Sequence, residues 1–387
     1  MKAIVNTKLV MEDGIIWDGT VLFDGDTILA ADWADKVTIP EGCECIDAGG
    51  HYTAPGLVDI HCHGSEKHFF TGDTDACCQH FLEHGHTTVL PTFYSNMDMN
   101  AMLEGAEKIR KASKEGVGRI MDGLYMEGPF MALMGSFRNS IKWTDEIRRE
   151  DYETLTGELG DLVRVWAIDP NREGIEEFMA YTRAHFPNVV FTLGHSLATA
   201  AQCRKLAKYG ITLQTHHGDS GKAPGFAQGT IGAGCDEYTL YNPDMYAELI
   251  CDQVGIHVAP DMIKMVVRIK GVEKMILISD SMPAAGDYKN NEALGIAYGP
   301  DLNYDDEGRL GGSHLTLDNA CRNLMTHTGY GLCHAIRMAT INPARMLGID
   351  DKIGSLEAGK KANFIIIDDM VHIKKVFLEG DLMVDNT

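Results

Sequence analysis

Short apolar segments with strand character alternate with helical segments through most of the chain, and this alternation limits the possible folds more than any other feature. One helix is indicated from an Asp98 cap over 98–115, and another from Thr199 over 199–209. Strands alternating with helices over this length indicate an α/β protein whose parallel sheet has helical crossovers. Eight strands is the number in a (β/α)8 TIM-like barrel. The expected strands are 57–61, 86–91, 119–125, 163–168, 189–194, 211–215, 254–258 and 275–279.

The two ends of the chain look different from this middle section. Residues 21–29 contain two apolar segments around an Asp-Gly turn, which predicts a β-hairpin. The last forty residues are also rich in strand formers. We therefore expect a small β-sandwich domain from 1–52 plus 350–387, and a barrel over 53–349. The Gly- and Asp-rich segment 281–314 breaks the alternation and is predicted to be a long loop beside the site.

Charge and composition exclude several classes of function. The formal net charge of the 387-residue chain is −22, which argues against a nucleic-acid partner or an anionic membrane surface. The N-terminus lacks a signal-peptide pattern, and no segment reaches transmembrane length. The ten cysteines include no Cys-x-x-Cys pair. We therefore expect a cytoplasmic protein in a reducing compartment.

Side chains of metal-ligand type occur at six of the eight expected strand ends, the edge at which barrel enzymes carry their catalytic groups. His61 and His63 follow the first strand, and residues two apart on a strand point to the same side. Histidine and carboxylate ligands suit a divalent ion that activates water. Asp280, at the last strand, suits the role of a base that passes a proton to a leaving group. The remaining strand-end groups are Glu127, His195, His216 with His217, and His257.

Each of these residues also has a simpler explanation when taken alone. Glu127 could be a charge at a helix N-terminus, and His195 could belong to a cap region. His257 could be a hydrogen-bonded core histidine, and Asp280 could form a turn. Together these explanations require six independent coincidences in register with the expected strands, so we favour a metal site.

The motifs around these strand ends resemble the N-acetylglucosamine-6-phosphate deacetylase family of the amidohydrolase superfamily. The Glu-Gly-Pro sequence at 127–129 and the Asp-Ser-Met-Pro-Ala-Ala-Gly sequence at 280–286 are the most specific to this branch. The resemblance spans nearly the whole chain. Its other motifs are 55–61, 85–92, 194–196, 215–216, 310–313 and 354–363.

This resemblance implies a role for each matching residue. Glu127, His195 and His216 would bind a primary divalent metal ion, and His61 with His63 would complete a second position. Zinc is the first expectation, with Fe, Co or Mn as alternatives, and one or two ions per chain. Asp280 would be general base and then general acid. His257 would orient the substrate, while Leu310, Gly311 and Gly312 would close over the acetamido group.

The sequence departs from the family where the substrate is expected to bind. The family commonly has Asn-Ala-Met and then an Arg for the sugar phosphate after the His216 position. Here the segment 217–225 begins His217-Gly218, is shorter and contains Lys222 but no Arg. A family Gly-x-His is replaced by Gly-Ser-Phe-Arg at 135–138. Lys222 or Arg138 would replace the missing phosphate-binding charge, or each is a solvated surface cation.

Three functions follow from these observations. The first is metal-dependent hydrolysis of the N-acetyl group of an amino sugar, N-acetylglucosamine-6-phosphate or a close relative, by a homodimer. The second is hydrolysis of a non-sugar amide, such as an N-acyl amino acid, a dipeptide or a cyclic amide, which the altered 217–225 segment keeps open. The third is a non-catalytic relative, against which the intact set of metal-ligand residues argues.

Overall fold

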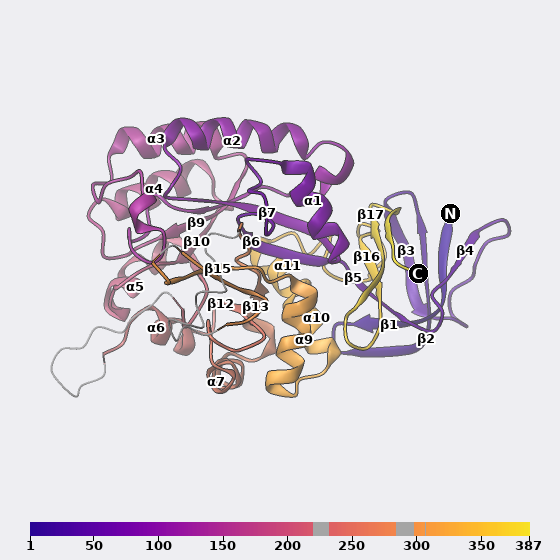
Figure 1. Cartoon of the computed structure of the whole chain (residues 1–387). Coiled ribbons are helices and arrows are strands. Elements are labelled where there is room, and N and C mark those ends of the chain that lie inside the picture. Colours follow the sequence, from indigo (N-terminus) through magenta and orange to yellow (C-terminus); the bar gives the residue numbers. More distant parts are fainter. Residues whose placement is uncertain (220–231, 284–297, 306) are drawn as a thin grey trace.

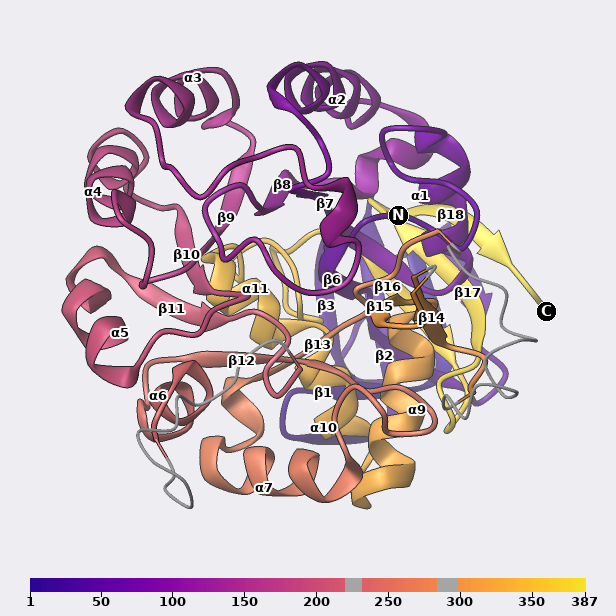
Figure 2. The same cartoon turned by 60° about the vertical axis from the view of Figure 1, so that its left-hand side comes forward.

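The computed structural model describes residues 1–219, 232–283, 298–305 and 307–387, and it contains two parts (Figure 1). The larger part is an eight-stranded parallel barrel, and Figure 2 shows its helices arranged around the strands. The smaller part is a separate β sheet built from both ends of the chain. The expected fold class, an α/β barrel beside a small β-rich part formed by the chain ends, is confirmed.

The barrel strands follow one another around the ring in chain order, each parallel to its neighbour. The first and last strands meet where the Asp280 backbone N–H donates to the His61 carbonyl at 2.9 Å. The residues of β6 are all buried, because helices cover its outer side and side chains fill the barrel. The strands are β6 (Leu57–Cys62), β7 (His86–Tyr94), β8 (Leu124–Glu127), β9 (Val163–Ile168), β10 (Val190–Leu193), β11 (Ile211–Gln214), β12 (Tyr246–Ile250) and β13 (Met275–Ile278).

The helices bury one apolar face against the strands. In α2 the Asp98 side chain caps the first turn, as predicted, and Met102, Ala106 and Ile109 are buried. None of the helices in the described ranges is long and apolar enough to cross a membrane. The helices are α1 (Thr74–Glu83), α2 (Met99–Ala112), α3 (Arg149–Leu159), α4 (Ile175–His185), α5 (Ala200–Leu206), α6 (Cys235–Tyr241), α7 (Pro260–Lys270), α9 (Leu317–Thr328), α10 (Leu332–Met338) and α11 (Ile341–Leu347).

Two predicted strands are displaced from their observed positions. The third, predicted at 119–125, begins only at Leu124, because a 3-10 helix occupies Gly116–Ile120. The seventh, predicted at 254–258, is wrong: β12 lies at Tyr246–Ile250, and 254–258 belongs to the loop before α7. The Asp252 carboxylate accepts the backbone N–H groups of Val254, Gly255 and Ile256, so these amides are not available to a sheet.

The prediction of one long loop over 281–314 is also wrong within the described residues. Strands β14 (Leu302–Tyr304) and β15 (Leu310–Ser313) form an antiparallel hairpin. A bridge between Ser281 and Ser313 holds this hairpin beside the end of β13. Residues 284–297 lie outside the described part of the chain. The β14–β15 hairpin thereby brings Leu310, Gly311 and Gly312 to the barrel opening.

The sheet at the chain ends joins N- and C-terminal strands directly. The predicted hairpin around Gly25 is present, with Asp24 paired to Thr27. Strand β5 pairs with β16, and Phe23, Phe364 and Phe377 pack in a shared core. The strands are β1 (Lys2–Met11), β2 (Gly14–Asp24), β3 (Thr27–Trp33), β4 (Glu44–Asp47), β5 (Tyr52–Pro55), β16 (Phe364–Ile367), β17 (Ile373–Leu378) and β18 (Asp381–Asp385).

Candidate active site

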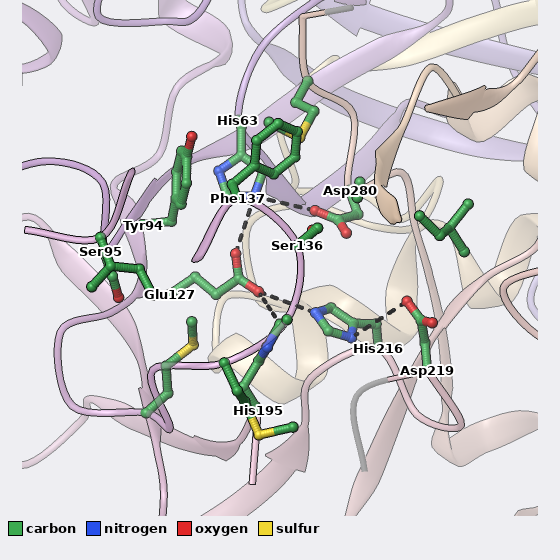
Figure 3. Close-up of a pocket in the computed structure, with 18 residues that line it drawn as sticks. His63, Tyr94, Ser95, Glu127, Ser136, Phe137, His195, His216, Asp219 and Asp280 are labelled. Atoms are coloured by element: carbon green, nitrogen blue, oxygen red, sulfur yellow. Dashed lines mark hydrogen bonds and ion pairs between the residues drawn. The ribbon is translucent and has the colours of Figure 1, made fainter. Parts of the chain in front are cut away.

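A cavity of about 230 Å³ opens at the carboxyl ends of the barrel strands (Figure 3). Its floor is polar and formed by groups that follow different strands, and apolar side chains form part of its walls. No lysine or arginine occurs among the described residues that line it. The polar lining residues are His63, Tyr94, Ser95, Glu127, Ser136, His195, His216, Asp219 and Asp280, and the apolar ones are Met131, Met134, Phe137, Ile141, Met282 and Leu310.

Four buried side chains form the first cluster of possible metal donors: His61, His63, Glu127 and Asp280. The His63 Nε2 atom lies 3.1 Å from Glu127 Oε2 and 3.2 Å from Asp280 Oδ1. The His61 Nε2 atom lies 3.5 Å from each of the same two oxygens. Strands β6, β8 and β13, distant in the sequence, therefore direct four ligand atoms toward one point.

The second cluster shares Glu127 with the first. Its other carboxylate oxygen, Oε1, lies 3.2 Å from His195 Nε2 and 3.1 Å from His216 Nε2. Figure 3 shows these histidines on one side of Glu127 and His63 with Asp280 on the other. Glu127 thus presents one oxygen to each cluster.

The donor atoms fit divalent ions. Ligands about 2.0–2.1 Å from a tetrahedral ion lie roughly 3.3 Å apart, close to the separations within both clusters. His61 Nε2 and Asp280 Oδ1 are buried without a hydrogen-bond partner in the described part of the chain. Unpartnered buried polar atoms are costly unless a further group satisfies them. The buried cluster indicates a divalent metal.

The other predicted substrate residues lie at different places around this centre. Leu310, Gly311 and Gly312 line the cavity. His257 does not line the cavity but contacts a residue that does: its Nε2 faces the Gly312 carbonyl at 3.1 Å, and its Nδ1 faces Asp252 Oδ2 at 3.2 Å.

Three of the four remaining predicted residues lie in the described chain but do not line the cavity, and the fourth is not described. The His217 ring is buried, with Nδ1 facing Gln214 Oε1 at 2.6 Å. Gly218 has a positive φ of 87° and forms the turn after His217. Lys222 lies outside the described residues. Arg138 is 61% exposed, and its guanidinium lies 3.8 Å from Glu307.

Comparisons with known proteins place the chain in a family. The profile of the Amidohydrolase family matches residues 52–383. The chain belongs to the amidohydrolase family. It is 28% identical to an N-acetylgalactosamine-6-phosphate deacetylase of Escherichia coli O157:H7, over 97% of both chains. It is 26% identical to the N-acetylglucosamine-6-phosphate deacetylase of Haemophilus influenzae, over 94% of both.

Solved structures support the fold of this amidohydrolase. The crystal structure of N-acetylglucosamine-6-phosphate deacetylase from Pasteurella multocida superposes with a TM-score of 0.83 at 23% identity, covering 98% of this chain and 99% of that chain. The corresponding structure from Thermotoga maritima has a TM-score of 0.79 at 22% identity, covering 99% and 100%. The barrel and the terminal sheet are therefore one shared architecture.

The carboxylates and histidines of the amidohydrolase centre shift one another's pKa values. Burial alone would lower the pKa of His61, but the Glu127 and Asp280 carboxylates raise it well above its ordinary value. Burial would also lower the pKa of His216, but the same two carboxylates raise it to about 9. Burial would raise the pKa of Asp280, but His61 and His63 lower it. Without a cation the carboxylates attract protons to the histidines, and a bound cation would replace them.

Several site residues have an unusual backbone. His195, His216 and Asp280 have φ angles of 35°, 20° and 49°, in or beside the left-handed region that non-glycine residues rarely adopt. All three lie two residues after the last residue of a barrel strand. Strained backbone of this kind is retained where it aims a functional side chain, and here it turns each side chain into the barrel opening.

Three polar residues at the site were not identified from the sequence, nor were the apolar residues that line the cavity. Glu248, in the middle of β12, is fully buried and faces His61. It is missed because the seventh strand is predicted at 254–258, which does not include it. Asp219 lines the cavity three residues after His216, and its Oδ2 lies 4.0 Å from the His216 Nδ1 atom. Tyr94 ends β7, so the strand-end rule would have found it had polar aromatic residues been included. The apolar wall residues carry no signal of their own in the sequence.

Proposed function

We propose that this amidohydrolase removes the acetyl group from an N-acetylated amino sugar, N-acetylglucosamine-6-phosphate or a close relative, and releases acetate and the free amino sugar. The observation that carries the proposal is the pair of donor clusters sharing Glu127 at the floor of the cavity. The names of the two relatives at 26% and 28% identity, both amino-sugar-phosphate deacetylases, support the substrate class.

We propose two zinc ions as the resident metals, with iron, cobalt or manganese as alternatives. Glu127, His195 and His216 would hold one ion, and His61, His63 and Glu127 would hold the other, with Asp280 beside it. Divalent metal in such a site lowers the pKa of water and polarises a carbonyl group. Metal analysis of protein purified without chelator tests both identity and number.

Asp280 is the proposed proton carrier. Its buried Oδ1 atom faces the cavity without a hydrogen-bond partner in the described residues. As the oxygen of water bonds to the acetyl carbon, Asp280 takes the proton of the water. It then gives this proton to the amine nitrogen as the C–N bond breaks, which releases the amine and acetic acid, and the acid ionises to acetate.

His257 is the proposed substrate-orienting residue. Asp252 fixes the ring, so that Nε2 lies beside Gly312 at the cavity edge. A hydroxyl or carbonyl oxygen of the sugar would compete with the Gly312 carbonyl for this N–H. The Gly311–Gly312 segment would then pack over the acetamido group.

The amino sugar could carry a phosphate only if a cation meets it. Lys222 and Arg138 are the candidates that the sequence offers, and Asp219 adds a negative charge to the cavity wall. This makes the phosphate the part of the proposal that an assay must decide.

The test is acetate release from N-acetylglucosamine-6-phosphate, N-acetylgalactosamine-6-phosphate and the two unphosphorylated sugars, with zinc supplied. We expect turnover of at least one of the four. Preference for a phosphorylated sugar that is lost in Lys222→Ala or Arg138→Ala would identify its cation. Inactivity on all four sugars with metal bound would reject the amino sugar and favour a non-sugar amide.

We also propose that the protein is a cytoplasmic homodimer, with a terminal domain of 1–52 plus 350–387 and a barrel domain of 53–349. All ten cysteines are free, which supports a reducing compartment. Two-fold homodimers are the commonest oligomers. Light scattering on the purified protein tests the dimer, and limited proteolysis tests the domain boundaries.

A further inference from the structure

A buried carboxylate that the proposed reaction does not use lies directly behind the metal centre. Glu248 is the central residue of β12, and its side chain has no exposed surface. A glutamate in the middle of a buried barrel strand costs stability unless it is paired, because its charge is removed from water. Its contacts show what it is paired with.

One oxygen of Glu248 makes two contacts with donor residues of the metal centre. Glu248 Oε2 lies 3.1 Å from the His61 Nδ1 atom. The same oxygen accepts the backbone N–H of His216 at 3.1 Å. The backbone carbonyl of Glu248 accepts the next N–H, that of His217, at 2.8 Å. The bond to the Glu248 carbonyl fixes β12 against the end of β11, and the His216 N–H holds Oε2 in place.

The contact with His61 decides how that ring is presented. When Nδ1–H donates to a carboxylate, the proton is on Nδ1 and the lone pair is on Nε2. His61 Nε2 is the atom that faces Glu127 and Asp280, and it has no hydrogen-bond partner in the described residues. Glu248 therefore favours the tautomer that a metal requires.

The surroundings leave the His61 ring few other orientations. Tyr125 stacks on it with ring centroids 4.3 Å apart, and the Tyr125 hydroxyl is held 2.7 Å from Thr215 Oγ1. The His61 ring is thus held between Tyr125 on its face and Glu248 at Nδ1, while Nε2 faces the carboxylates of the metal centre. A carboxylate hydrogen-bonded to a ligating histidine is a general device that orients the ring and increases its basicity.

We propose that Glu248 is a positioning residue, which holds His61 with Nε2 directed at the Glu127 and Asp280 oxygens and so sets the affinity of the metal position formed by His61 and His63. The inference rests on the proposed metal-dependent function. Its readout is zinc binding, which needs no substrate, so failure of the sugar assay and failure of this inference are separate results.

The experiment measures the zinc dissociation constants of the full-length protein by competition with a chromophoric chelator. Glu248→Leu keeps the volume but removes the acceptor, and we expect the more weakly held zinc to bind on the order of 100-fold more weakly. Glu248→Gln keeps an acceptor oxygen without the charge, and we expect a loss of roughly 10-fold. Asp318→Asn is the matched control, since Asp318 is a buried carboxylate paired with His84 and Arg322 instead.

A second background separates positioning from a purely structural role. In His61→Ala, adding Glu248→Gln should leave the dissociation constant of the retained zinc unchanged, because the ring on which Glu248 acts is gone. Wild-type affinity for both ions in Glu248→Gln would overturn the proposal, even if Glu248→Leu failed to fold. Equal weakening with and without His61 would also overturn it, because Glu248 would then act through the His216 backbone.

Discussion

Glu127 connects the two donor clusters because its carboxylate oxygens face different histidines. Oε2 lies near His61 and His63, whereas Oε1 lies near His195 and His216. Burial would raise the pKa of this carboxyl, but the surrounding imidazoles lower it well below its ordinary value. The group is therefore an anion that both positions share.

Asp280→Asn separates metal binding from proton transfer. The asparagine oxygen can stay among the donors, but it cannot accept and release a proton. We expect near-normal zinc content and a fall in kcat on the order of 10²–10⁴, the usual effect of losing a general acid–base group. Zinc content by mass spectrometry and acetate release measure the two effects. The companion variant His195→Ala should lose zinc first, and an Asp280→Asn protein with wild-type kcat would exclude Asp280 as the proton carrier.

Asp219→Asn tests how the cavity responds to an anionic substrate. The Asp219 carboxylate lines the cavity, and at a distance of several ångströms it opposes a phosphate by on the order of 1 kcal/mol. We expect the variant to raise kcat/KM for 6-phosphorylated sugars by roughly fivefold. The unphosphorylated sugars serve as the internal control, since their kcat/KM should change little. An equal change in kcat/KM for phosphorylated and unphosphorylated sugars would mean that Asp219 acts through its neighbour His216 and not through its charge.

At the scale of one element, the loop between β12 and α7 is organised by a single carboxylate. Asp252 accepts the backbone N–H groups of Val254, Gly255, Ile256 and His257. It also faces the His257 ring. Asp252 thereby shapes the loop and orients the histidine that reaches the cavity edge.

Asp252 gives a pH-dependent contribution to stability. Burial would raise its pKa, but the His257 ring and the backbone N–H groups lower it to about 2. A carboxyl whose folded pKa is depressed stabilises the protein above its unfolded pKa, about 3.9, and this stabilisation is lost as the pH falls toward 2. We expect Asp252→Asn to lower the free energy of unfolding by roughly 2 kcal/mol at pH 7 and by less at pH 3. Urea unfolding at both pH values measures this, and an equal loss at both would contradict it.

The strand ends show which parts of the site the sequence predicts and which it does not. Five of the strand ends that carry candidate ligands were predictable, because an apolar segment runs directly into His61, Glu127, His195, His216 or Asp280. The seventh strand was not, because Glu248 interrupts its apolar pattern and a buried charge is rare. Its compensation comes from His61, 187 positions away in the sequence. Pairing between residues so far apart leaves no pattern in the local sequence. The Asp252-x-x-Gly255 turn, by contrast, is a local pattern that indicates a loop, and it was overlooked.

At the scale of the whole molecule, the donor cluster that contains His61, His63 and Asp280 lies where the barrel closes. His61 and His63 follow the first barrel strand, and Asp280 follows the last. Backbone bonds from Asp280 to His61, and from His63 to Ser281, join these two strand ends. The Glu127 and Asp280 carboxylates and the two histidines meet at this junction of the first and last strands. An ion bound there would therefore connect β6, β8 and β13 directly. The terminal sheet contributes no donor to either cluster.

Metal removal should therefore weaken the barrel more than the terminal sheet. An ion that binds only the folded state stabilises it by about 4 kcal/mol at a thousandfold excess of free ion over Kd. We expect chelation to lower Tm by several degrees and zinc to restore it, with His61→Ala, which lacks a donor to this ion, as a control that shows a smaller change. Hydrogen exchange after chelation should increase in β6 and β13 and stay nearly constant in β1 and β2. Equal increases in both parts would mean that the ion stabilises the fold as a unit, and an unchanged Tm would mean that the barrel closes without it.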